Sequence, residues 1–397
     1  MLALFLRSKL AGVGMSKKRI SVSDVQIGQA LKWDVYGSDG GLLLRRGFVV
    51  SNENQIEILL QRGMYLADDI GEGEPQIDAE GRKIFPKTVE RPSVVRMIAQ
   101  VRNELSTLSF NLTETPQART QFLVLAKKTM IATYLDSDVA LGSILLHQTG
   151  GYAVRHCVDV AIVSILVAKA LKKTDEEIIF LVAACLSMNI SMLSQQEHLQ
   201  AKSEDLSADE QALIFHHPEQ SVALLKAAGV HDEAWLSWIL HHHENEDGTG
   251  YPGKKHSADI PQNAKIISIA DRYCARICAR SYRKSLLPSA ALKDILVAGK
   301  STVDLMLVAL FIRELGTYPI GSFVKLENGE LGVVTSKGGT ATTPYVHVLT
   351  DAWGAPLPVP IKRDTHKNLH GIREVLHRDQ VRVIFAMRHL WGEIAME

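Results

Sequence analysis

The sequence has no excess of charge of either sign, no long apolar run and no closely spaced cysteine pair. Its 397 residues include 44 basic and 44 acidic ones, which argues against nonspecific binding to nucleic acid or an anionic membrane. The apolar stretches 1–6 and 178–186 are too short to span a bilayer. Without a Cys-x-x-Cys pair, the cysteines are interpreted as reduced core thiols of a cytoplasmic protein: Cys157, Cys185, Cys274 and Cys278.

What the chain does have is 46% hydrophobic residues, enough for a sizeable core, with a periodicity that changes along its length. Residues 1–18 are expected to be a disordered extension, 19–68 a small β-rich module, and 69–92 an acidic linker rich in proline and glycine. Helical spacing of apolar residues then continues over 93–316. Residues 317–397 contain a hairpin signal at Asn328-Gly329 and a charged tail. The predicted fold class is mainly α, a helical bundle with a small β-rich N-terminal domain and a small C-terminal β-element.

Several elements can be predicted more closely. In the N-terminal module, 35–44 resembles two strands joined by a glycine turn, 47–50 a further strand, and 53–62 a helix. In the helical stretch, Ser207 and Glu210 form a capping box that begins a helix. We expect this helix to end at His216-His217-Pro218 and a separate helix to follow, because proline is disfavoured inside helices.

Candidate metal ligands are spread over four places in the helical stretch. His156 lies on an otherwise apolar helix face, His217 precedes a proline, His242 and His243 end a helix, and Asp271 lies on the apolar stripe of another. Taken singly, each has a plainer interpretation: a core histidine with a partner, a helix end offsetting the dipole, or a salt bridge. Together they could form a metal site in the core of a bundle, because a buried carboxylate is costly unless it is paired or metal-bound.

The two histidines run into an acidic, glycine-rich turn, residues 244–252, that ends in Gly250-Tyr251-Pro252. The glycines permit unusual backbone dihedrals and the proline fixes the exit from the turn. Its backbone N–H groups could bind a phosphate. Tyr251 could stack on a base, contact a partner or pack in the core.

The order and spacing of these residues resemble the HD-GYP family. The resemblance covers residues 151–318 and includes Tyr152-x-x-x-His156, His217-Pro218, the run from His242 to Pro252, Ile269-Ala270-Asp271, and Arg280-x-Tyr282-Arg283-Lys284. It implies a helical, metal-dependent phosphohydrolase domain that cleaves cyclic di-GMP. It also implies that Arg280, Arg283 and Lys284 contact phosphate, and that the Gly-Tyr-Pro turn contacts GGDEF domains.

One part of the family pattern is missing. Where the family carries His-Asp and then Ile-Gly-Lys, this chain has Ser187 and Met188, with Ser191 in place of the lysine. The resemblance implies that the missing aspartate bridges two metal ions. A thioether is a poor ligand for iron(II), manganese or magnesium, and a serine hydroxyl is a weak neutral one.

The remaining ligands divide unevenly between the two implied metal positions. One position would have only His156 and Asp271 as ligands. The other would have His217, His242 and His243, and would lack only the bridging aspartate. Three histidines with one open position is an arrangement that suits zinc. We therefore expect at most one divalent ion, either zinc, iron or manganese. Nearby residues that could substitute as ligands are Glu197, His198 and Asp205.

The sequence thus predicts a cyclic di-GMP signalling protein with a degenerate, catalytically impaired HD-GYP domain. It would act by binding cyclic di-GMP or a related nucleotide, or a protein partner such as a GGDEF domain, and neither nucleic acid nor membrane is an expected partner. The alternative is an active metal-dependent cyclic di-GMP phosphodiesterase with a remodelled one-metal or rebridged site.

Overall fold

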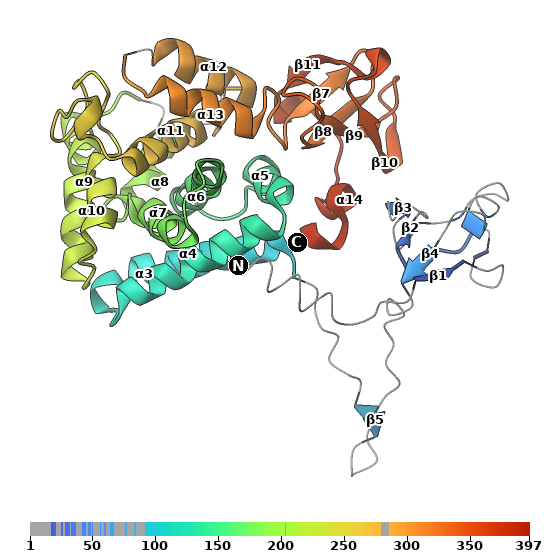
Figure 1. Ribbon diagram of the computed structural model, residues 1–397, viewed down its shortest axis with the longest axis horizontal. Coiled ribbons are helices and arrows are strands. Elements are labelled where there is room, and N and C mark those ends of the chain that lie inside the picture. Colours follow the sequence, from blue (N-terminus) through green and yellow to red (C-terminus); the bar gives the residue numbers. More distant parts are fainter. Residues whose placement is uncertain are drawn as a thin grey trace. The chain divides into compact units, whose positions relative to one another are not determined.

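The computed structural model describes residues 92–202, 204–278, 286–299 and 301–397, and short stretches between residues 17 and 84. It divides the chain into two compact units, residues 1–90 and 91–397. Figure 1 shows both units as ribbons. The second unit is mainly helical with a small antiparallel sheet, which agrees with the predicted fold class.

The described part of the first unit is a small β structure. Its antiparallel sheet has the strand order β1-β4-β2-β3, where the strands are β1 (Lys17–Arg19), β2 (Val35–Tyr36), β3 (Leu42–Leu44) and β4 (Met64–Leu66). The pairing of β2 with β3 confirms the strand pair predicted at 35–44. Phe48 and Val50 are not in a regular strand, although both make backbone hydrogen bonds with residues 28–31. Of the helix predicted at 53–62, only Ile56, Leu59 and Leu60 are described, and they are helical.

Most of the linker predicted at 69–92, and the whole of 1–16, lies outside the described residues. Within the linker, the short strands β5 (Gln76–Ile77) and β6 (Lys83–Ile84) pair antiparallel.

The second unit begins with a bundle of helices. Their bounds are α3 Val94–Phe110, α4 Ala118–Leu135, α5 Ser137–Leu146, α6 Tyr152–Ala170, α7 Asp175–Ser187, α8 Leu193–Ala201, α9 Ala208–Ala227, α10 Glu233–His241, α11 Gln262–Ile277, α12 Pro288–Ala298 and α13 Leu305–Leu315. Helix α6 is the centre of this bundle, because it packs against α3, α4, α7, α8, α11 and α13. Its side chains are accordingly buried around most of its circumference.

Helix α9 differs from the sequence prediction. The capping box of Ser207 and Glu210 begins it as predicted, but the helix does not end at His217 and continues through Pro218 to Ala227. A proline inside a helix leaves the carbonyl four residues earlier without its usual donor. Here that carbonyl belongs to Ile214, and the ring of His217 donates a hydrogen bond to it at 2.6 Å. The helix therefore passes through the proline with that acceptor satisfied.

A five-stranded antiparallel sheet follows the helices, in the order β10-β9-β8-β7-β11. Its strands are β7 (Phe323–Leu326), β8 (Leu331–Ser336), β9 (Tyr345–Thr350), β10 (Pro356–Asp364) and β11 (Ile372–Leu376). The Asn328-Gly329 turn joins β7 to β8 as the sequence predicts, with Gly329 at φ 91°. Strand β9 agrees with a third strand expected at 345–349 from its alternating residues, and the sheet is completed by β10 on one side and by β11, in the charged tail, which pairs with β7.

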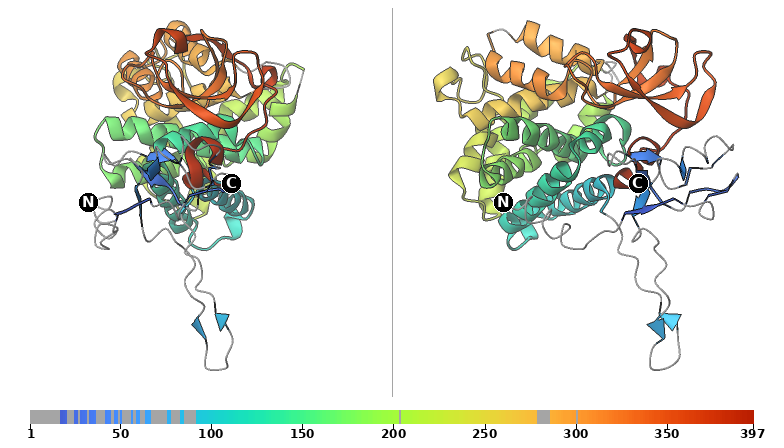
Figure 2. Two further views of the ribbon diagram at one scale, coloured as in Figure 1. Left: turned by 90° about the vertical axis from the view of Figure 1, so that its right-hand side faces the viewer. Right: turned by 45° about the vertical axis from the view of Figure 1, so that its right-hand side comes forward.

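The chain end ties the sheet to the bundle. After the short helix α14 (Arg388–Trp391), the Trp391 indole donates to the carbonyl of Thr335 in β8 and lies against Gly142 of α5. The hydroxyl of Ser93, at the start of α3, bonds the carbonyl of Met396. In Figures 1 and 2 the sheet lies beside α5, at the end of the unit opposite α9 and α10.

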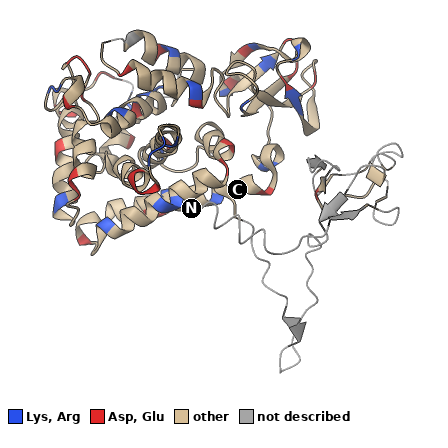
Figure 3. Ribbon diagram, viewed as in Figure 1, with Lys and Arg blue, Asp and Glu red and all other residues tan. Residues whose placement is uncertain are grey.

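Basic and acidic residues are interspersed along the ribbon in Figure 3. Over the described residues, none of the helices alone is long and apolar enough to cross a membrane; α4 and α5 pass that test only as a pair bent by 107°.

Candidate functional site

Three histidines meet where α9 packs against α10. His217 lies in the middle of α9, His242 is the C-cap residue directly after α10, and His243 follows it. One ring nitrogen from each lies within 4.8 Å of the others. His217 and His242 are almost completely buried. The structure thus brings together, from two helices, three of the five metal ligands predicted from sequence.

The hydrogen bonds of the two buried rings define how they face each other. The Nδ1 of His217 bonds the Ile214 carbonyl and the Nδ1 of His242 bonds the Ile239 carbonyl, each at 2.6 Å. Since a carbonyl oxygen can only accept, each Nδ1 carries the proton, and in a neutral ring the Nε2 is then a bare acceptor. The two Nε2 atoms lie 3.3 Å apart. Two lone pairs this close repel each other unless a cation or a shared proton lies between them.

Burial keeps the three histidine rings neutral, which is the form that can bind a metal ion. Desolvation, together with the neighbouring His242, lowers the pKa of His217 to about 3. Burial also lowers the pKa of His242, and it lowers that of His243 well below the usual range. Neutral imidazoles with aligned Nε2 atoms are the form that binds a transition metal. The cluster of His217, His242 and His243 therefore fits a divalent metal ion.

His156 and Asp271 form a second part of the site. His156, on α6, places its Nε2 2.6 Å from Oδ1 of Asp271 on α11. Burial alone would raise the pKa of Asp271, but the hydrogen bond with His156 and the electrostatic influence of the neighbouring histidines outweigh it and lower that pKa. The ring of Tyr152 stacks on His156 with the centroids 5.4 Å apart. In this arrangement the two predicted ligands bind each other.

A cavity of about 170 Å³ connects the two parts. His156, Asp271, His217 and His243 all line it, with nine further residues: Tyr152, Asn189, Met192, Gln196, Leu199, Gln200, Leu206, Ile214 and Ala275. Asp271 is the single carboxylate in this lining. The cavity is smaller than a pocket for a drug-sized ligand, which measures at least about 300 Å³. It would thus admit part of a ligand, such as a phosphate group.

Ser187 and Met188 have partners within the protein. The Ser187 hydroxyl accepts a hydrogen bond from the Trp235 indole at 2.9 Å and donates one to the Ala183 carbonyl at 2.6 Å. Met188 has no exposed surface and belongs to the hydrophobic core. Ser191 donates to the carbonyl of His217 at 3.0 Å and so joins this segment to α9. All three side chains are thus engaged in packing or in hydrogen bonds.

The residues expected to substitute for the missing ligands point elsewhere. Glu197 accepts the backbone N–H of Ala153 at 2.6 Å and so caps the start of α6. The side chain of His198 is 76% exposed, and Asp205 is also exposed. None of the three lines the cavity.

The Gly-Tyr-Pro turn is fastened to the histidine cluster. The ring of Tyr251 lies between Phe215 and His243, stacked on each with centroids 4.7 Å and 4.8 Å away. Its backbone N–H donates to the His243 carbonyl. The buried carboxylate of Glu244 accepts the N–H groups of Gly253 and Lys255 at 2.6 Å and 2.9 Å. Of the N–H groups expected to bind phosphate, those of Gly248, Thr249 and Tyr251 are used for hydrogen bonds within the protein.

Gly250, at the middle of the turn, is buried against the backbone of Glu244 and Asn245, where a Cβ atom would come within 2.6 Å of backbone atoms. Pro252 is partly buried and leaves the turn. Arg280, Arg283 and Lys284, the predicted phosphate contacts, lie outside the described residues.

Some residues of the site were not identified from the sequence. Asn189 and Gln196 line the cavity and their side-chain amides lie 3.4 Å apart. Arg272, largely buried, donates to the Asn245 side chain at 2.6 Å and so ties α11 to the turn. Its position directly after Asp271 was the one available signal. Amide side chains such as Asn189 carry no pattern that separates a cavity lining from a surface.

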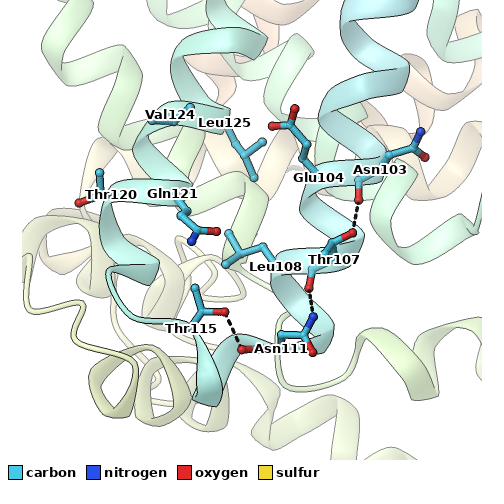
Figure 4. A pocket seen from close by; sticks show the side chains of 10 residues that line it. All are labelled: Asn103, Glu104, Thr107, Leu108, Asn111, Thr115, Thr120, Gln121, Val124 and Leu125. Atoms are coloured by element: carbon cyan, nitrogen blue, oxygen red, sulfur yellow. Dashed lines mark hydrogen bonds between the residues drawn. The ribbon is translucent and has the colours of Figure 1, made fainter.

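Larger cavities are present away from the histidines. One of about 430 Å³ lies between the ends of α3 and α4 (Figure 4). The polar side chains in it bond the backbone of their own helices and turns, as Thr107 does to the Asn103 carbonyl and Thr115 to that of Asn111. Its Glu104 carboxylate is paired with Lys128. Its size alone therefore does not make it a better candidate than the smaller histidine-lined cavity.

Comparison with known proteins gives a consistent picture. The HD domain family matches residues 148–307. A cyclic di-GMP phosphodiesterase of Pseudomonas aeruginosa is 28% identical over 224 residues, covering 56% of this chain and 54% of that protein. Another from Borreliella burgdorferi is 24% identical over 202 residues, covering 51% and 53%.

Among solved structures, a Bdellovibrio bacteriovorus protein whose title calls it an HDG"Y"P protein has a TM-score of 0.49 and 18% identity, covering 75% of this chain and 98% of that one. The chain spans about half the length of the curated relatives it matches. The match at residues 148–307 contains all five histidine and aspartate positions described above. Residues 148–307 of this chain are thus similar to the HD domain family, which agrees with the resemblance found in the sequence.

Proposed function

We propose that this protein takes part in cyclic di-GMP signalling through an HD domain that holds at most one divalent metal ion and lacks two-metal phosphodiesterase activity. It would act by binding the nucleotide or a protein partner. The proposal rests mainly on Ser187 and Met188. The Ser187 hydroxyl is hydrogen-bonded to the Trp235 indole and the Ala183 carbonyl, and Met188 is packed in the hydrophobic core.

The charge of the cavity supports the same proposal. Two divalent ions side by side repel each other strongly and need anionic ligands between them. Asp271 is the single carboxylate in the described lining, and it is bonded to His156. The three-histidine cluster, in contrast, is suited to one ion. A divalent ion bound there would supply Lewis-acid polarisation of a phosphoryl oxygen.

The residues around that position would contribute binding and orientation. His217 and His242 are held by their backbone hydrogen bonds, and Tyr251 is held between Phe215 and His243. The cavity volume of about 170 Å³ fits a phosphate group with the rest of a nucleotide at its mouth. Relatives named as cyclic di-GMP phosphodiesterases make that dinucleotide the first ligand to test.

A second candidate function is a one-metal phosphodiesterase. It is favoured by the retained cluster and by the proximity of the His156–Asp271 pair, which line one cavity with it. Asp271, with its lowered pKa, is ionised at neutral pH and could bind a cation or accept a hydrogen bond from a ligand hydroxyl.

A protein partner is part of the proposal as well. Thr249 and Lys254 are exposed to solvent beside the Gly-Tyr-Pro turn, whereas Gly250 is buried. A GGDEF domain is the partner to test at this surface. A pull-down comparing the protein with Thr249→Arg, a substitution outside the histidine cluster, tests that contact. Equal binding by both proteins would remove the turn from the interface.

The deciding experiment combines metal analysis with turnover. Protein purified without chelator should carry no more than one ion per chain and should bind cyclic di-GMP without opening its ring in the presence of manganese or iron(II). His242→Ala is the matched control. Two ions per chain, or hydrolysis that His242→Ala abolishes, would overturn the proposal; hydrolysis with one ion would establish the second candidate.

A further inference from the structure

Helix α9 contains a carbonyl group that has no backbone N–H donor within the helix. In an α-helix the N–H of each residue donates to the carbonyl four residues earlier. Pro218 has no N–H, so the Ile214 carbonyl lacks that donor. The ring Nδ1 of His217, the residue next to the proline, donates to it instead at 2.6 Å. Pro218 thus leaves the Ile214 carbonyl free, and the ring of the neighbouring His217 occupies it.

This hydrogen bond determines which nitrogen of His217 faces the cluster. With the proton on Nδ1, the unprotonated Nε2 points to the Nε2 of His242, 3.3 Å away. With the opposite tautomer, the ring would present a proton to the cluster and could not bind a metal ion through that atom. A partner that fixes the tautomer of a metal-binding histidine is therefore part of the site.

His242 obtains the same arrangement in a different way. Its Nδ1 donates to the Ile239 carbonyl, also three residues earlier and also at 2.6 Å. That carbonyl is available because α10 ends at His241, and the last carbonyls of a helix have no donor within the helix. His217 lies in mid-helix, ten residues before α9 ends, where a carbonyl would ordinarily be occupied.

We propose that Pro218 is a positioning residue for His217: by withholding one backbone donor, it reserves the Ile214 carbonyl for the imidazole and so fixes the metal-binding tautomer. The proposal rests on the function proposed above only in taking the three-histidine cluster as the metal site. The proline would then be present for the sake of the histidine, at the expense of helix stability.

The test uses the full chain with two substitutions that restore the donor, Pro218→Ala and Pro218→Gly. Alanine is the best helix former and glycine a poor one, so their effects on thermal stability should differ, with Pro218→Ala the more stable. Both return an N–H that competes for the Ile214 carbonyl. Both should therefore weaken zinc binding, measured by chelator competition, by about 10- to 100-fold, the range typical of lost outer hydrogen bonds.

A spectroscopic measurement tests the tautomer without any metal. In chelator-treated protein, ring ¹⁵N shifts of His217, assigned by comparison with His217→Gln, should show protonated Nδ1 in the natural sequence. Both Pro218 variants should gain the Nε2-protonated form. His242 is an internal control that should keep its tautomer, and Pro288→Ala, at the first turn of α12, is a control for replacing a proline elsewhere.

The outcomes separate the possibilities. Unchanged tautomer and unchanged zinc affinity in both variants would overturn the proposal. An affinity that follows thermal stability, rising in one variant and falling in the other, would also overturn it, because Pro218 would then act on the helix alone. If the unsubstituted protein binds no zinc, the metal function fails, and the tautomer measurement still decides the role of Pro218.

Discussion

The histidine cluster and the segment from Ser187 to Ser191 stand at neighbouring places in the same bundle but use their polar atoms in opposite ways. In the cluster, the backbone takes up Nδ1 of His217 and His242 and leaves their Nε2 atoms facing each other. In the segment, the hydroxyls of Ser187 and Ser191 bond protein groups. The cluster therefore leaves ring nitrogens available for a ligand, whereas the segment uses its hydroxyl groups for hydrogen bonds within the protein.

The most demanding test of this difference is to put the family residues back. The double substitution Ser187→His and Met188→Asp removes the acceptor of the Trp235 indole, places a larger ring at Ser187 and puts a carboxylate in the core in place of a thioether. We expect the free energy of unfolding, measured in urea, to fall by more than about 4 kcal/mol. Metal content should stay at one ion per chain or fewer. A stable double variant carrying two ions would show that the segment is still arranged as a metal site.

Removing a ligand from the retained part should have a large effect on metal binding instead. His242→Ala deletes one of three ring nitrogens, so we expect zinc affinity to fall by more than about 100-fold, beyond the loss typical of outer hydrogen bonds. Chelator competition measures it. His198→Ala is the matched control, because that side chain is 76% exposed and should leave zinc affinity unchanged. Equal losses in both variants would place His198 among the ligands.

The sequence predicted the retained part of the site better than its surroundings. Spacing and residue type located His156, His217, His242, His243 and Asp271, because motifs of this kind depend on local order along the chain. The continuation of α9 through Pro218 was missed, since proline normally ends a helix and its compensation by the His217 ring is a contact in space. The sheet was underestimated because β11 pairs with β7, although three other strands separate them along the chain.

The fate of the missing ligands could not be predicted either. The family resemblance implies a histidine at the position of Ser187, but it does not indicate that Trp235, 48 residues later, donates to the Ser187 hydroxyl. Likewise, Glu197 was a chemically reasonable substitute ligand, and only the structure shows that it caps α6 at Ala153. Such partners depend on how helices pack, for which a single sequence carries little information.

The next largest effect is expected from a fall in pH. It should change the stability contributed by the histidine cluster but not that of the segment from Ser187 to Ser191, because only the cluster contains ionisable side chains. The folded-state pKa of His217 is lowered to about 3, so as the pH falls below about 6.5 the unfolded chain binds a proton that the folded one does not. Stability is therefore lost progressively from pH 6.5 down to about 3. In metal-free protein, we expect His217 alone to lower the free energy of unfolding by about 2 kcal/mol between pH 7 and pH 5.

Urea unfolding at pH 7 and pH 5, with His217→Gln as the control, measures the contribution of His217 to the free energy of unfolding. The glutamine variant should lose less stability on acidification than the unsubstituted protein. The same pH dependence in both proteins would mean that His217 is already charged when folded, which contradicts the buried neutral cluster.

The smallest effect is expected from Ser187→Ala, which tests the segment from Ser187 to Ser191 directly. Ser187→Ala leaves the Trp235 indole N–H buried without its acceptor, which should lower the free energy of unfolding by about 1–2 kcal/mol. Zinc content and affinity should not change, because the hydroxyl is used by Trp235 and Ala183. Trp235→Phe removes the same hydrogen bond from the other side, so the double variant should be less destabilised than the sum of the two. A loss of zinc in Ser187→Ala would instead make Ser187 a ligand and remove the contrast between the two regions.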